Sequence, residues 1–73
     1  MSFGRNPHVA KAEAAEQRAS EASDSIAFEQ AWREAGRQWE RAAEREKDPK
    51  RRALYITRSE AARATADAPQ LTE

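Results

Sequence analysis

The stretch FEQAWREAGRQWERAA, residues 28–43, constrains this chain more than any other. Its apolar residues recur at spacings of three and four, which places them on one face of a helix. That face carries both tryptophans of the chain and three smaller apolar groups: Phe28, Trp32, Ala35, Trp39 and Ala42. Charged residues take the other faces. We therefore expect an amphipathic helix whose aromatic face organises the fold.

The small size of the chain limits the stability that such a helix can provide. With 73 residues, the chain forms one domain at most. Ordering each residue costs about 1.5 kcal/mol, whereas burying a bulky apolar side chain contributes roughly 1.5–3 kcal/mol. Alanine supplies most of the 38% hydrophobic share, and there is no cysteine for a disulfide. We therefore expect the chain either to be marginally stable alone or to gain burial from a partner protein or from a second copy.

Capping residues predict where the helices begin. Asn6-Pro7 starts a first helix that extends to about Ala22. Its apolar stripe is thin, because all but one of its members are alanine: Val9, Ala12, Ala15, Ala19 and Ala22. Residues 1–6 are expected to form a flexible tail.

The segment Ser23-Asp24-Ser25 admits two interpretations. These residues favour caps and turns, and the apolar stripe changes phase beside them, which indicates a break before a second helix from about Ser25 to Glu46. The alternative is one helix from Pro7 to Glu46, roughly 60 Å long. The turn is the preferred prediction.

A third helix is predicted from Asp48-Pro49 to about Asp67. The short connection makes it an antiparallel neighbour of the second helix, so Trp39 should lie near Tyr55 and Ile56, and Trp32 near Ala62. Its apolar arc contains Leu54, Tyr55, Ser59, Ala61, Ala62, Thr65 and Ala66, with Ile56 at the edge. The predicted fold is all-α, an antiparallel helical hairpin with a leading helix, forming a small three-helix bundle that can oligomerise. Its single domain spans residues 7–67, and residues 68–73 form a frayed tail.

Two features of the second helix have structural interpretations. Gly36 interrupts good helix formers, which suggests either that another helix approaches its backbone closely or that an aromatic ring needs the room. Arginine recurs every four residues at Arg33, Arg37, Arg41 and Arg45, and glutamates lie within three or four positions of each. We interpret this face as solvated ion pairs in preference to a phosphate-binding ladder.

The sequence argues against catalysis. Cysteine is absent and His8 is the only histidine, expected as an exposed residue at a helix start. A serine triad and a structural zinc site therefore have no candidate residues. The sequence also contains no glycine-rich phosphate loop. We predict no enzyme activity, no metal and no cofactor. Charges balance at 13 basic and 13 acidic residues, which argues against non-specific DNA or membrane binding. No signal sequence or membrane span is evident, so we expect a cytoplasmic protein.

Two candidate binding surfaces remain. The first is the aromatic face with its expected neighbours on the third helix: Phe28, Trp32, Trp39, Tyr55 and Arg58. Arg58 falls inside the apolar arc, where it would stack on Trp39 or pair with Glu34 or Glu40. The second is a basic cluster around the turn between the last two helices, formed by Arg45, Lys47, Lys50, Arg51 and Arg52. It is either an ordinary charged loop or a docking patch for an acidic partner or RNA phosphates.

Residues 27–66 resemble known helical hairpins. The run AFEQAWREAGRQWERAAE and the later YITRSEAARA are similar to hairpins of tetratricopeptide-like proteins and to the three-helix MIT (microtubule-interacting and trafficking) domains. Ala35-Gly36 followed by Trp39 resembles the small and aromatic positions of a tetratricopeptide first helix. Tyr55, Arg58, Ser59 and Glu60 resemble a stretch of the last MIT helix. Both families bind helices or short peptides in grooves, so the resemblance implies a protein-interaction role.

The preferred prediction is thus a non-enzymatic protein–protein interaction module, a small adaptor or scaffold, that binds a partner helix or a short peptide on its aromatic face. The first alternative is a self-assembling structural protein in which the same face closes a homodimer. The second is an RNA-binding helper that uses the basic cluster, although nucleic acid is not favoured because the aromatic residues have core spacing.

Overall fold

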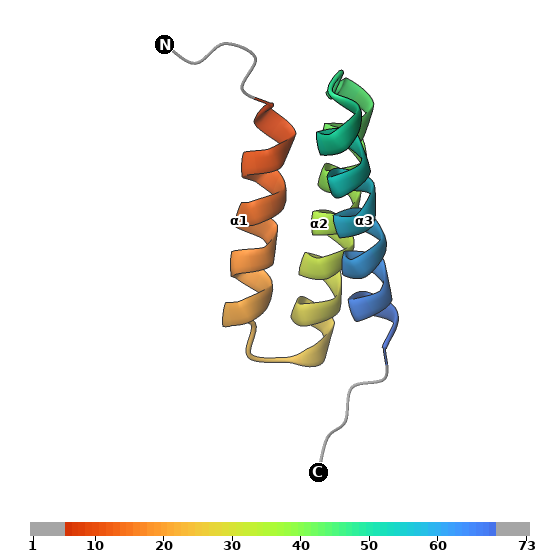
Figure 1. Cartoon of the computed structure of the whole chain (residues 1–73). Coiled ribbons are helices and arrows are strands. Elements are labelled where there is room, and N and C mark those ends of the chain that lie inside the picture. Colours follow the sequence, from red (N-terminus) through yellow and green to blue (C-terminus); the bar gives the residue numbers. More distant parts are fainter. Residues whose placement is uncertain (1–5, 69–73) are drawn as a thin grey trace.

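The computed structural model describes residues 6–68 and contains three helices in that range, with no strand. They are α1 (Pro7–Glu21), α2 (Ser25–Arg45) and α3 (Pro49–Asp67) (Figure 1). The all-α prediction is confirmed. The predicted tails lie outside the described residues, except for Asn6 and Ala68.

The central element is α2. Helices α1 and α3 both pack against it and run opposite to it, whereas within residues 6–68 α1 and α3 do not pack directly on each other (Figure 1). The three helices therefore form an open arrangement with α2 at its base. This openness decides which apolar residues are covered.

Each helix begins at a residue that the sequence identified as a cap. The Asn6 side chain accepts a hydrogen bond from the His8 backbone N–H at 3.0 Å and donates to the Ala42 carbonyl at 2.9 Å. Asp24 accepts from Ala27 at 2.7 Å, and Asp48 accepts from Arg51 at 2.9 Å. Asn6 was expected in the tail, but it fastens the start of α1 to the end of α2.

The predicted turn at residues 23–25 is confirmed. Helix α1 ends at Glu21, and the next backbone angles are extended, with φ −66° and ψ 137° at Ala22 and φ −138° and ψ 164° at Asp24. The alternative of one continuous helix is wrong, because Asp24 caps α2 and Ala22 has left the helical conformation.

The core consists mainly of alanine methyl groups. Its central cluster is Ala12, Ala15, Ala35, Trp39, Ala42 and Ala62, with Val9, Trp32 and Tyr55 packed against it. Among the described residues, Trp39 is the one large side chain that is fully buried, with 1% of its surface exposed. In α1 the expected stripe is confirmed, since Ala12, Ala15 and Ala19 are buried. Small side chains let the helices approach closely but bury little apolar area.

At Gly36, α3 lies close to the backbone of α2. A Cβ atom at this position would lie 3.1 Å from Cγ of Arg63 and 3.5 Å from the Ser59 carbonyl oxygen. The prediction that this glycine admits a neighbouring helix is confirmed.

The predicted apolar arc of α3 is only partly buried. Ser59, Ala62 and Ala66 are buried as expected, but Ala61 is exposed and Leu54 retains 45% of its surface. Leu54 and Ala61 belong to the predicted arc but are not covered, because α3 packs against α2 alone and one helix cannot cover so wide an arc. An apolar strip is left open on the side of α3 that carries Arg58.

His8 also differs from the expectation of an exposed residue. It is half-buried, and its Nδ1 lies 2.9 Å from Oε1 of Gln38 on α2. The first turn of α1 lies against α2, and this contact draws the imidazole into the interface between the two helices.

Candidate partner-binding groove

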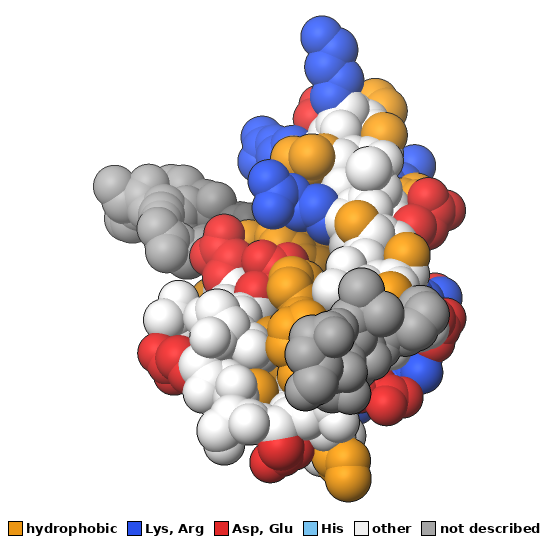
Figure 2. Space-filling model, turned by 90° about the horizontal axis from the view of Figure 1, so that it is seen from below, with side chains coloured by type: hydrophobic (Ala, Val, Ile, Leu, Met, Phe, Trp, Pro, Cys, Tyr) orange, Lys and Arg blue, Asp and Glu red, His pale blue; other side chains and the backbone are white. Residues whose placement is uncertain are grey.

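A groove lies between α1 and α3, and its floor is the aromatic stripe of α2. Trp39 contacts Glu16 of α1 on one side and Tyr55 of α3 on the other, so it faces the space between the two outer helices. Phe28 and Trp32 continue the same stripe along α2. In Figure 2, hydrophobic side chains gather in the hollow between the two outer helices. We call this surface the aromatic groove.

Three side chains enclose Trp39 at one end of the groove. Its indole N–H donates to Oε2 of Glu16 at 2.7 Å. Tyr55 stacks on it with ring centroids 5.5 Å apart and an interplanar angle of 29°. The guanidinium carbon of Arg58 lies 5.2 Å from the ring centroid, a cation–π distance. Trp39 is therefore a structural anchor, and Tyr55, Arg58 and Glu16 present the accessible surface above it.

The other end of the groove is less covered. Phe28 and Trp32 are both half-buried and meet edge to face, with ring centroids 6.2 Å apart. The indole nitrogen of Trp32 is shielded from solvent and has no hydrogen-bond partner among the described residues. These two rings therefore leave apolar surface open to solvent at this end of the groove.

The structure thus brings together all five predicted residues of the aromatic face. Phe28, Trp32 and Trp39 lie along the floor, and Tyr55 and Arg58 border it from α3. Of the alternatives for Arg58, stacking on Trp39 is confirmed. Its other expected partners are engaged elsewhere, Glu34 with Arg37 and Glu40 with Arg63. Sequence reasoning missed Glu16, since nothing local distinguishes it from the other glutamates.

The two flanks of the groove carry opposite charge. On α1, Glu13 lies one turn before Glu16 on the groove side, and on α3, Arg51 lies two turns before Arg58 on the same face. Glu13, Arg51 and Arg58 are exposed and Glu16 is half-buried. Leu54 and Ala61 lie four positions before and three positions after Arg58, so they form an apolar lip beside the basic flank.

The predicted ion pairs on the outer faces of α2 form at Arg33 and Arg37, whereas Arg41 and Arg45 pair with no carboxylate among the described residues. Within the helix, Arg33 pairs with Glu29 at 2.8 Å and Arg37 pairs with Glu34 at 2.6 Å. Two further pairs join α2 to α3, which the sequence did not indicate: Arg33 with Asp67 at 2.7 Å, and Arg63 with Glu40 at 2.5 Å. All are exposed enough to water to contribute little individually.

A short chain of polar side chains runs from Glu34 through Gln38 to His8 and so links α2 to α1. Gln38 donates from its amide nitrogen to Oε2 of Glu34 at 2.8 Å, so its oxygen faces His8 and the imidazole Nδ1 must carry the proton. Hydrogen bonds from Gln38 and then from Arg37 lower the pKa of Glu34 below its ordinary value, against a smaller opposing effect of burial. Hydrogen bonds to Glu29 and Asp67 raise the pKa of Arg33. Neither arrangement places an acid and a base in an enclosed site.

The basic cluster at the α2–α3 turn has a structural role for one of its members. Arg52 donates from Nε to the Glu46 carbonyl at 3.1 Å and from Nη2 to the Lys47 carbonyl at 3.4 Å. These bonds satisfy carbonyls at the end of α2. Nε of Arg51 lies 3.8 Å from Oδ2 of Asp48. The remaining predicted members, Arg45, Lys47 and Lys50, are exposed.

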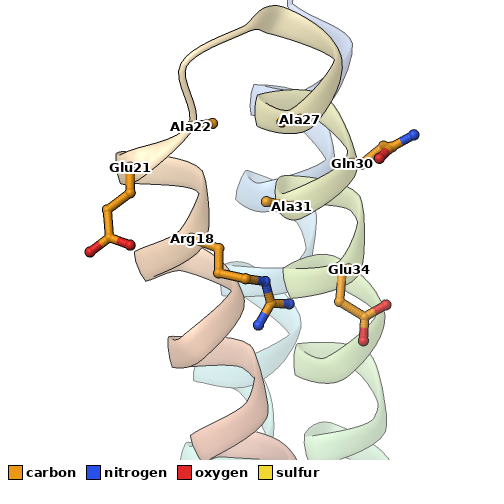
Figure 3. Close-up of a pocket in the computed structure, with 7 residues that line it drawn as sticks. All are labelled: Arg18, Glu21, Ala22, Ala27, Gln30, Ala31 and Glu34. Atoms are coloured by element: carbon orange, nitrogen blue, oxygen red, sulfur yellow. The ribbon is translucent and has the colours of Figure 1, made fainter.

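A pocket of about 410 Å³ lies between α1 and α2, beside the loop that connects them. It is lined by Arg18, Glu21, Ala22, Ala27, Gln30, Ala31 and Glu34. Figure 3 shows the Arg18 side chain extending into the space between the two helices, while Gln30 points away from it. The pocket is shallow, and three of its seven lining residues are alanine. No sequence signal indicated it.

Within residues 6–68, no cluster of three or more His, Cys, Asp or Glu side chains is placed to hold a metal ion. None of the three helices combines the length and the apolar character needed to cross a bilayer.

Comparisons with known proteins identify no relative: no family model, no curated protein and no solved structure matches this chain. The resemblance to tetratricopeptide-like and MIT hairpins therefore stays a prediction.

Proposed function

We propose that this protein is a non-enzymatic interaction module, a small adaptor or scaffold, that binds an amphipathic α-helix in the aromatic groove. One observation carries the proposal: α1 and α3 each pack on α2 but not on one another, which leaves Phe28, Trp32 and the Leu54 lip partly uncovered. A helix laid between the outer helices would bury all three. The cysteine-free composition is compatible with a role in the reducing cytoplasm.

The described residues also support a non-catalytic role over a catalytic one. Their carboxylates are spread over helix faces and helix ends, five of them paired with arginines, and the histidine is engaged with Gln38. General acid–base chemistry requires a positioned group within reach of a bound substrate. The residues that line the shallow pocket beside Arg18 include no histidine, cysteine or serine.

The alternative of RNA binding at the basic cluster is weaker. Arg52 is occupied by carbonyls of its own turn, and Arg51 is near Asp48. The aromatic rings that would stack on bases lie in the groove, with Trp39 and Tyr55 packed on each other. These contacts favour the aromatic groove over the basic cluster as the partner-binding surface.

Site-specific photo-crosslinking tests this proposal. A benzophenone side chain placed at Ala61 lies on the groove lip, and one placed at Ala64 provides the matched control, since Ala64 is also exposed and lies nearly opposite the buried face of α3. We expect crosslinks to a defined helical segment from position 61 and not from position 64, with the pure protein or with cell extract. Mass spectrometry then distinguishes a second copy from another protein. Equal yields at the two positions would overturn the proposal.

A further inference from the structure

The charges and the apolar strip beside the aromatic groove indicate what binds in it. We propose that the occupant is a second copy, which lays its α3 against α1 and its α1 against α3, in a two-fold dimer whose axis runs parallel to the helices. This inference rests on the proposed function, since it requires that the groove binds helices. It adds the partner, the contacting helices and the symmetry.

The first argument is that α3 has the apolar strip that such a groove needs. Leu54 is 45% exposed, Ala61 is exposed and Thr65 is half-buried. They lie at spacings of seven and four, which places them on one face, and Arg58 lies between them. Within residues 6–68 no helix covers this strip. The chain thus carries both an open groove and an uncovered helix face of matching character.

The second argument is charge complementarity. The α1 flank of the groove is acidic through Glu13 and Glu16, and the α3 flank is basic through Arg51 and Arg58. Glu16 and Arg58 lie at the same height along the groove, because both contact the single ring of Trp39. A partner that pairs with both flanks must therefore present basic groups toward α1 and acidic groups toward α3. A second copy turned to face the first does this.

Symmetry selects the direction of the two-fold axis. An axis parallel to the helices places α3 of one copy against α1 of the other at the same height, so Arg58 faces the partner's Glu13 and the partner's Glu16. An axis across the helices places α1 against α1 and α3 against α3, which brings like charges together. Like-charge contacts oppose association, so the parallel axis is the one that the charges permit.

The third argument concerns size and balance. A standard interface buries about 800 Å² per partner, a modest part of the 5337 Å² accessible surface of this chain. One face can supply it. The formal net charge of zero means that two copies do not repel each other overall. Burial of the strip and the groove would supplement a core that is otherwise mostly alanine methyl groups.

Sedimentation equilibrium over a concentration series tests the dimer, with Leu54→Glu as the variant and Ile56→Glu as the matched control. The two residues are nearly equally exposed, at 45% and 43%, but Ile56 lies on the other side of α3. We expect the wild type to dimerise, Leu54→Glu to raise the dimer Kd at least about tenfold, and Ile56→Glu to leave it unchanged. Because both sites are exposed, helicity should be retained in both variants.

Charge reversal tests the symmetry. Glu13→Arg alone and Arg58→Glu alone should each weaken the homodimer, whereas an equimolar mixture of the two variants should form a heterodimer in which both contacts are restored. If Glu13→Arg homodimerises as well as the wild type, the axis is wrong. Circular dichroism and tryptophan fluorescence of each variant verify that Trp39 stays buried.

The outcomes separate this inference from the function on which it rests. A strictly monomeric wild type, or equal effects of Leu54→Glu and Ile56→Glu, overturns the second copy as occupant. In that case crosslinking from position 61 to another protein would still support the groove. Absence of selective crosslinking from position 61 overturns the groove itself.

Discussion

The indole N–H of Trp39 donates a hydrogen bond of 2.7 Å to Oε2 of Glu16. This bond joins the most buried large side chain of α2 to a helix that otherwise contributes mainly alanine methyl groups to the core. It is charge-assisted, and it lies where the aromatic groove meets its acidic flank. The same carboxylate therefore stabilises the fold and contributes to the character of the proposed binding surface.

Removal of the Glu16 carboxylate should destabilise the protein. Glu16→Ala leaves the indole N–H without its acceptor, and we expect a loss of about 1–3 kcal/mol in the free energy of unfolding. Urea denaturation followed by tryptophan fluorescence measures this loss. Lys11→Ala is the control, because Lys11 is exposed on the same helix and its replacement should change stability by less than about 0.5 kcal/mol. Equal effects of the two substitutions would contradict the role assigned to the hydrogen bond.

Substitutions at Gly36 should depend steeply on size. An alanine Cβ would meet the Cγ of Arg63 at 3.1 Å, and this exposed side chain can shift, so the strain should nearly cancel the helix-propensity gain of about 1 kcal/mol. A leucine would also press on the backbone carbonyl of Ser59 at 3.5 Å, and overpacking of this kind costs about 1–3 kcal/mol. Thermal unfolding of the two variants provides the comparison. A leucine variant as stable as the alanine variant would mean that α3 does not approach α2 at this glycine.

Glu34 should give the protein a small acid sensitivity. Its folded-state pKa is lowered by hydrogen bonds from Gln38 and Arg37, so its contribution is present above the unfolded-state pKa near 4.5 and is lost as pH falls below that value. Because the group is only partly buried, with 31% of its side-chain surface exposed, water screens these interactions and the effect should be no more than about 1 kcal/mol. Unfolding midpoints at pH 7 and pH 3 should differ less for Glu34→Gln than for the wild type. Glu44→Gln, an exposed position on the same helix, should behave as the wild type does.

The cap of α3 should have a measurable effect on stability. The Asp48 carboxylate accepts from the Arg51 N–H at 2.9 Å, and its replacement by alanine should cost about 1 kcal/mol, or roughly 4–8 °C in Tm for a chain of this size. Lys47→Ala next to it is the control. If Asp48→Ala and Lys47→Ala have the same Tm, the carboxylate does not cap the helix.

The helix boundaries were predictable because their causes are local. Asn6, Asp24 and Asp48 each accept a hydrogen bond from a backbone N–H two or three residues further along the chain, so the sequence nearby contains both partners. The stacking of Tyr55 on Trp39 followed from the short α2–α3 connection, which determines the antiparallel register. The aromatic face was predicted on the same grounds.

The remaining features depend on how distant elements are placed. The exposure of Leu54 results from the position of α1, which does not reach α3. The link from Trp39 to Glu16 spans 23 positions, and the pair of Arg33 with Asp67 spans 34. Helical periodicity gives the direction of a side chain on its own helix, but it does not specify which of several similar charges on another helix will be its neighbour.

Attachment of α1 to a single neighbour has a consequence for how the molecule opens. Its contact with α2 uses Ala12, Ala15 and Ala19, so separating the two uncovers little apolar area and requires less free energy than global unfolding. Amide protons of α1 should accordingly exchange with solvent earliest and those of α2 last. If α1 moves away from α2 about residues 22–24, one side of the Trp39 indole becomes exposed. The chain can then enlarge its exposed apolar surface while the α2–α3 hairpin stays folded.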